Sequence, residues 1–157
     1  MDKNNVIAAV LLVIVAVIAC IIAFTPSGDV SADNVISLDG VTFNTTKTTD
    51  FVKTDERNES GYLMKYYVDA NGTGKSYVNI LECKDMGLVE SVMNAHASFP
   101  SQTVDDITVY TESGSTGEDL NETEYVSVMK GADNRIVIIG SPDLDETVKM
   151  ASTLKLN

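Results

Sequence analysis

The sequence predicts an α+β domain with a mostly antiparallel sheet and two helices packed on it, preceded by one N-terminal transmembrane helix. Three observations lead to this prediction. An unbroken apolar stretch lies near the start, several short runs alternate apolar and polar residues between turn signals, and two later stretches show helical spacing after an aspartate. The chain therefore divides into an anchor and a single folded domain.

The apolar stretch is Val6–Phe24, which contains no charged residue, proline or glycine. A helix of this length spans about 28 Å, close to the thickness of a bilayer hydrocarbon core. It is longer than the apolar core of a cleaved signal peptide, which favours an uncleaved anchor. Two alternatives stay open: cleavage after Val30-Ser31-Ala32, and lipid modification of Cys20.

The flanking charges predict the orientation of this anchor. Lys3 and the terminal amine precede it, whereas Asp29 and Asp33 follow it without any basic residue. Because basic flanks tend to stay in the cytoplasm, we predict a single-pass protein of the cell membrane with its C-terminal domain outside. The predicted organisation is a cytoplasmic tail at 1–5, an anchor at 6–24, a flexible linker at 25–34 and an extracytoplasmic domain at 35–157.

Composition limits the partners of this domain. The chain has 157 residues and a formal net charge of −12, and the anchor contributes no charge. About 120 residues remain outside the anchor and its flanks, enough for one domain core. An acidic domain has no electrostatic basis for binding nucleic acid. The expected partners are the lipid bilayer, through Val6–Phe24, and an envelope protein.

The first part of the domain predicts a hairpin. Two short apolar runs, Val35–Leu38 and Val41–Asn44, flank Asp39-Gly40, which is a strong turn signal. The following polar segment, 45–60, predicts a loop with at most one helical turn. Phe51 and Val52 are its only expected core contacts.

The middle of the chain predicts two strands and a helix. Tyr62–Asp69 alternates with period two, and a second strand runs over 76–84, with Cys83 buried and inert in it. Asp85 can cap a helix over Met86–Ser98. The apolar stripe expected on this helix consists of Val89, Val92, His96 and Phe99.

The last third predicts three strands and a second helix. Strands are expected at Ile107–Glu112, Tyr125–Lys130 and Arg135–Gly140, and the last is apolar on both faces, which is typical of a central strand. Asp143 and Glu146 have capping-box spacing at the start of a helix. Its predicted buried stripe consists of Leu144, Val148, Ala151 and Leu154.

Two of these segments carry a family resemblance. VISLDGVTFN and YVSVMKGADNRIVIIGSPDLDETVKMASTLKL resemble the corresponding parts of PsbP/Mog1/DcrB-like domains. The resemblance implies an α/β/α sandwich around an antiparallel sheet and a role as an accessory or binding subunit, and it carries over no functional residue. The whole chain is also similar to small membrane-anchored exported proteins of methanogenic archaea.

Four sequons predict sites of N-glycosylation in an exported domain. The tripeptide Asn-x-Ser/Thr begins at Asn44, Asn58, Asn71 and Asn121, and its middle residue is never proline. Chance occurrence in a chain rich in Asn, Ser and Thr is the alternative explanation.

Motifs for chemistry are weak. Gly72–Ser76 imitates a phosphate-binding loop but is followed by a strand, and His96, the single histidine, lies on the apolar stripe of its helix. Four carboxylates of one acidic loop could gather a calcium ion, although a solvated loop explains them as well. They are Glu118, Asp119, Glu122 and Glu124.

The sequence therefore predicts a non-enzymatic accessory or interaction domain with no catalytic residue, cofactor or metal. The alternatives are a domain that binds a small molecule or Ca²⁺ and a small hydrolase that uses His96 with a nearby Ser and Asp.

Overall fold

The computed structural model describes residues 34–70, 75–113 and 123–156. Among these residues, no helix is long and apolar enough to cross a membrane. The predicted tail, the anchor Val6–Phe24 and nearly all of the linker lie outside the described residues. The first described residue, Asn34, begins a strand.

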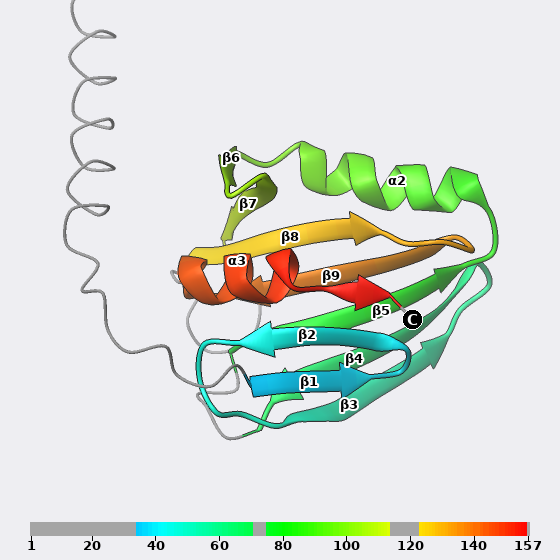
Figure 1. Cartoon of the computed structure of the whole chain (residues 1–157). Coiled ribbons are helices and arrows are strands. Elements are labelled where there is room, and N and C mark those ends of the chain that lie inside the picture. The colour runs from blue at the N-terminus through cyan, green and yellow to red at the C-terminus, as the bar shows by residue number, and fades with distance from the viewer. Residues whose placement is uncertain (1–33, 71–74, 114–122, 157) are drawn as a thin grey trace, which may run out of the picture. The chain divides into compact units, whose positions relative to one another are not determined.

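The described residues form two antiparallel sheets and two helices, which confirms the predicted sheet-rich α+β architecture (Figure 1). The small sheet has the order β1-β2-β10 and the large sheet the order β3-β4-β5-β9-β8-β7-β6. The strands are β1 Asn34–Leu38, β2 Val41–Thr45, β3 Phe51–Asn58, β4 Tyr62–Asp69, β5 Tyr77–Cys83, β6 Ser101–Val104, β7 Ile107–Ser113, β8 Thr123–Lys130, β9 Arg135–Ser141 and β10 Lys155–Leu156; the helices are α2 Met86–Ala97 and α3 Leu144–Ser152.

The β1–β2 hairpin forms as predicted. Asp39 and Gly40 occupy the turn with φ angles of 36° and 78°. Glycine adopts this left-handed conformation without steric cost and aspartate tolerates it, so the Asp-Gly pair matches the turn.

The central strand of the large sheet is β9, as its two apolar faces predicted. It lies between β5 and β8, and Ile136–Gly140 are all buried. Successive side chains alternate between faces, so Val137 and Ile139 point to one side and Ile136 and Ile138 to the other. We call these sides the α3 face and the α2 face after the helices that cover them.

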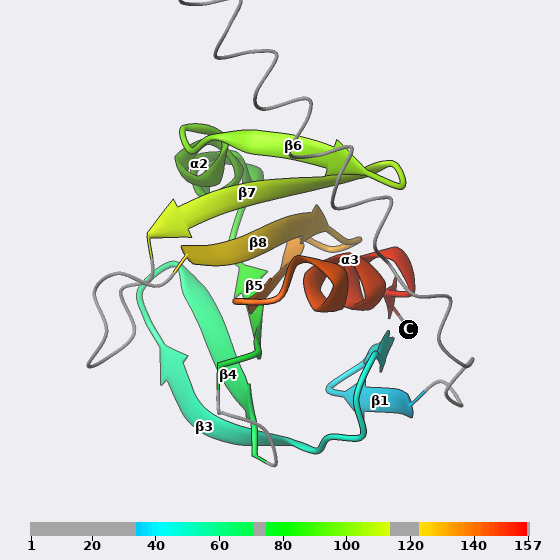
Figure 2. The same cartoon turned by 90° about the vertical axis from the view of Figure 1, so that its left-hand side faces the viewer.

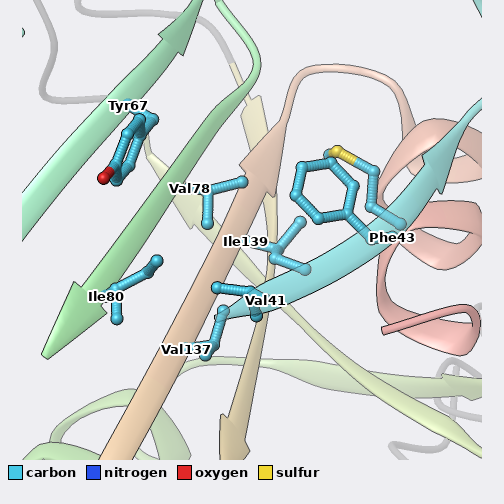
Figure 3. Packing of buried hydrophobic residues seen from close by; sticks show 8 residues of the cluster. Val41, Phe43, Tyr67, Val78, Ile80, Val137 and Ile139 are labelled. Carbon is cyan, nitrogen blue, oxygen red and sulfur yellow. The ribbon is translucent and has the colours of Figure 1, made fainter. Parts of the chain in front are cut away.

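The α3 face holds one of the two apolar cores of the described residues. Val41 and Phe43 of β2 pack there on residues of β5 and β9, and Figure 3 shows these side chains converging. The remaining buried members of this cluster are Tyr67, Val78, Ile80, Val137, Ile139 and Met150. The small sheet and α3 thus cover this face together.

The α2 face is covered by one helix, and Figure 2 shows the two helices on opposite sides of the large sheet. The side chain of Asp85 accepts a hydrogen bond from the backbone N–H of Leu88, which confirms the predicted cap. Val89 is buried and Val92 is partly buried against the sheet, also as expected. Phe99, by contrast, is 42% exposed, because the helix ends at Ala97 and the chain leaves its apolar stripe.

Two edge strands of the large sheet were not expected from the sequence, nor was β10 at the edge of the small sheet. The segment predicted as a loop, 45–60, contains β3, and β6 precedes the predicted strand of β7. Both strands are largely exposed, and a bulge between Lys53 and Asp55 interrupts the two-residue period of β3. A mostly solvated edge strand needs no apolar alternation, so the pattern that identifies central strands is missing.

The second helix is capped at the predicted residue but not by the predicted reciprocal box. Asp143 accepts hydrogen bonds from the backbone N–H groups of Asp145 and Glu146. The carboxylate of Glu146 instead accepts from the backbone N–H of Thr46, at 2.7 Å, and from its hydroxyl. This buried carboxylate therefore ties α3 to the end of β2 rather than to its own cap.

Candidate functional site

The titratable groups of the α2 face centre on His96. It lies in the last turn of α2, where helical spacing from Val89 and Val92 turns it toward the sheet. Its Nδ1 is 2.6 Å from Oε1 of Glu112 on β7, and the two side chains are only 18% and 19% exposed. The ring of Tyr110 stands beside it, with 6.4 Å between ring centroids. His96 is thus held by a carboxylate rather than embedded in apolar residues alone.

A second carboxylate lies next to this pair. Glu124 of β8 is directly opposite Glu112, a like-charge arrangement that disfavours the sheet unless positive charge or solvent compensates it. His96 contacts Glu112 beside this arrangement. Sequence reasoning missed Glu112, because its position depends on the strand register and on how α2 crosses the sheet.

Two tyrosines extend this cluster across the sheet. The rings of Tyr66 and Tyr77 stack at a tilt with centroids 5.6 Å apart. Burial, and next the charge of Glu124, raises the pKa of both phenols. They therefore stay protonated, as hydrogen-bond donors, through the physiological range. Nearby, Oδ1 of Asn79 is buried without a hydrogen-bond partner among the described residues.

The contacts of the His96 ring bear on the hydrolase alternative. Within the described part of the chain, the one hydrogen bond of the His96 ring goes to Glu112, and no serine or threonine hydroxyl is bonded to it. An imidazole between a carboxylate and a nucleophilic hydroxyl is the arrangement that acyl transfer requires. The geometry supports a hydrogen-bonded contact that fixes α2 on β7.

The described residues contain no group of three or more His, Cys, Asp or Glu side chains that could hold a metal ion. Glu124 is described, whereas the other carboxylates of the predicted acidic loop, Glu118, Asp119 and Glu122, lie outside the described residues. The Ca²⁺ hypothesis for that loop stays a prediction.

A separate polar cluster ties the β1–β2 turn to the large sheet. The Tyr67 hydroxyl donates to Oδ2 of Asp39, and Nζ of Lys65 lies 3.4 Å from the same oxygen. The hydrogen bond from Tyr67, reinforced by the charge of Lys65, lowers the pKa of Asp39. Burial, and then this bond, raises the pKa of Tyr67. The Tyr67 and Lys65 side chains both contact the Asp39 carboxylate, which is typical of a structural contact.

The four predicted sequons differ in their surroundings. Asn44 lies within β2, where its backbone N–H donates to Oγ1 of Thr153 and the hydroxyl of Thr46 is bonded to Glu146. Asn58 ends β3, and both Asn58 and Ser60 are exposed. Asn71 and Asn121 lie outside the described residues. Of the two described sequons, the second is the more accessible in the folded domain.

Two surface clefts are lined by both polar and apolar residues. One of about 450 Å³ lies between the small sheet and the end of α3, and Val35, Asn44 and Lys155 are among its lining residues. The other, of about 320 Å³, contains the ion pair between Arg135 and Glu82, with Nη2 and Oε1 3.4 Å apart.

The cysteine of the domain is buried, as the sequence predicted. Cys83 is 7% exposed at the end of β5, and burial raises the pKa of its thiol. A buried, protonated thiol is a poor nucleophile, so Cys83 serves the core.

Comparisons with known proteins add no functional assignment. No protein-family model matches the chain, and no curated protein and no solved structure is similar to it. The resemblance to PsbP/Mog1/DcrB-like domains stays a prediction.

Proposed function

We propose that the chain is a membrane-anchored extracytoplasmic accessory or interaction domain that performs no catalysis itself. Val6–Phe24 would form its single transmembrane helix, with residues 1–5 in the cytoplasm. An α/β/α sandwich of the PsbP/Mog1/DcrB-like kind is the fold family that we propose for the domain, because helices and strands cover both faces of its large antiparallel sheet.

The observation that supports an interaction role most directly is the edge strand β6. Among the described strands it pairs only with β7, and its residues Ser101, Gln102 and Thr103 are exposed. A strand with one free edge offers backbone donors and acceptors to another chain. The His96–Glu112 contact supports the non-enzymatic part of the proposal, because it links α2 to β7 without a bonded nucleophile.

Anchoring can be tested on the full chain in cells. We expect the protein to remain in the membrane pellet after alkaline extraction, and external protease to digest the domain in intact cells. We also expect the mature protein to retain its original N-terminus. A matched variant with Leu11→Arg and Val15→Arg should lose the membrane fraction, since each buried charge costs about 2.5–3.5 kcal/mol in a helix centre.

Other outcomes would contradict the proposal. A mature N-terminus at Asp33 would show a cleaved signal, and a protease-resistant domain in intact cells would reverse the orientation. Incorporation of labelled lipid that depends on Cys20 would replace the helical anchor with a lipid anchor.

A further inference from the structure

The backbone of β6 presents its free hydrogen-bonding groups at two residues. The β6–β7 turn is Asp105-Asp106, with φ angles of 49° and 65°, so Val104 and Ile107 close a two-residue hairpin and bond each other. The hydrogen bond from the Thr111 N–H to the Pro100 carbonyl, 2.8 Å, fits the same alternation of bonded and non-bonded pairs. Even-numbered residues of β6 therefore point their backbone groups at β7.

The odd-numbered residues of β6 point the other way. In an antiparallel ladder, successive residues point their backbone groups to opposite sides of the strand. The N–H and C=O groups of Ser101 and Thr103 therefore face outward from the sheet. Within the described part of the chain, no strand pairs with them on that side. Ser101 and Thr103 thus form a two-residue acceptor for another strand.

The opposite edge of the large sheet is protected. On β3, Lys53 pairs with Glu56 and Asp55 with Arg57, and the bulge after Lys53 breaks the register. Charges and bulges are the features that block edge-to-edge pairing, and β6 has no charged side chain. A sheet with one open edge and one blocked edge can pair with one further sheet but cannot continue into a row of sheets. Such pairing favours a closed dimer over a fibre.

We propose that β6 pairs antiparallel with β6 of a second copy of this chain, with Ser101 opposite Thr103 of the second copy. This register uses both outward-facing residues of each strand and places Gln102 opposite its own counterpart on the two-fold axis. It also places Asp105 opposite Phe99 of the second copy, so no acidic side chains oppose one another. Parallel pairing in register would instead stack the Asp105-Asp106 turns.

The interface is small, so its strength depends on the proposed anchoring. Four backbone hydrogen bonds and a short contact give a weak dimer in solution, and the net charge of −12 per copy opposes association. Copies anchored in one membrane share a high effective concentration, which makes such a contact effective. The inference therefore rests on the proposed function and specifies its partner.

Disulfide trapping in the full chain tests this register. All variants carry Cys20→Ala, which leaves the buried Cys83 as the native thiol. Gln102→Cys places two thiols at a non-hydrogen-bonded pair on the axis, where Cα atoms lie about 4.5 Å apart, within disulfide range. Val52→Cys on β3, an exposed site on the blocked edge, is the matched control. After mild oxidation of the cell fraction that holds the protein, we expect about tenfold more dimer from Gln102→Cys than from the control.

A second substitution tests the hydrogen bonds. Thr103→Pro removes an outward N–H without removing a bond to β7, so β6 should persist while pairing fails. In the Gln102→Cys background it should reduce the dimer to the level of the Val52→Cys control. If Thr103→Pro left the amount of cross-linked dimer unchanged, the cross-link would reflect random collision of copies, and the proposal would be overturned.

The remaining outcomes separate this inference from the proposed function. A Gln102→Cys adduct with a different protein would overturn self-pairing but keep the interaction role. No adduct of any kind would overturn self-pairing and remove the support that β6 gives to the interaction role. Trapping is measured in whichever cell fraction holds the protein, so failure of the anchor is a separate result.

Discussion

The two faces of the large sheet differ in how completely they are covered. On the α3 face, Phe43, Val137 and Ile139 have no solvent exposure, and two strands and a helix contribute to the cover. On the α2 face, the cover is a single helix with one buried residue, Val89, packed on an apolar cluster that includes Val126 and Ile136. Tyrosines and carboxylates lie beside this cluster. The comparison indicates that the α3 face is the more completely covered of the two, while the α2 face also accommodates polar groups.

The largest expected effect is a difference in stability loss between alanine substitutions at two neighbouring residues of β9, one on each face. Ile139→Ala should lose stability near the upper end of the usual range of about 2–5 kcal/mol, because the rigid α3-face core cannot close the cavity. Ile138→Ala, on the α2 face at 7% exposure, should fall near the lower end. Denaturant unfolding with a common m-value gives both numbers. Equal losses, or a larger loss for Ile138→Ala, would contradict the comparison.

The second prediction concerns space on the α2 face. A Cβ atom on Gly140 would lie 2.3–2.5 Å from ring carbons and the hydroxyl oxygen of Tyr77. Gly140→Ala should therefore cost about 1–3 kcal/mol through overpacking. In the Tyr77→Ala background the same substitution should cost much less, since the ring is gone. If the stability losses of the two substitutions were additive in this double-mutant cycle, the Tyr77 ring would not be the reason for glycine at position 140.

The third prediction tests the contact between His96 of α2 and Glu112 of β7. His96→Gln should lower the free energy of unfolding by about 0.5–1.5 kcal/mol, because Glu112 then loses its partner beside Glu124. Glu90→Gln, at an exposed position of the same helix, is the control and should change little. Unchanged stability, together with loss of an ester or peptide hydrolysis activity found in the wild type, would favour the hydrolase alternative.

The smallest expected effect lies on the α3 side, at the β1–β2 turn. The pKa of Asp39 is lowered in the folded protein, so its charge stabilises the fold above the unfolded pKa near 3.8, and this stabilisation is lost as pH falls through the folded value. Asp39→Asn should cost less than about 1 kcal/mol at pH 7, because the carboxylate is partly exposed. The difference from wild type should shrink toward pH 3.

Unfolding measured at both pH values checks this prediction. Asp133→Asn serves as a control for asparagine in a turn, because Asp133 also has a left-handed backbone, with φ of 54°. A difference for Asp39→Asn that grows at low pH would reverse the expected sign.

The sequence determined the elements whose pattern is local. Alternation located β4, β5, β8 and β9, and two buried faces identified β9 as the central strand. Asp85 and Asp143 located the helix starts, since a cap depends only on the next three residues. The Asp39-Gly40 turn and the burial of Cys83 followed from the same short-range patterns.

The tertiary structure alone decided which distant residues meet. Glu146 fits a capping box by spacing, yet it bonds Thr46, 100 residues away, because α3 packs beside β2. His96 meets Glu112 only because the fold brings the last turn of α2 beside β7. The segment of β6 forms a strand because it pairs with β7. Such contacts depend on strand order and register, which no local period encodes, so the polar cluster of the α2 face and the open edge of the sheet appear only in the folded domain.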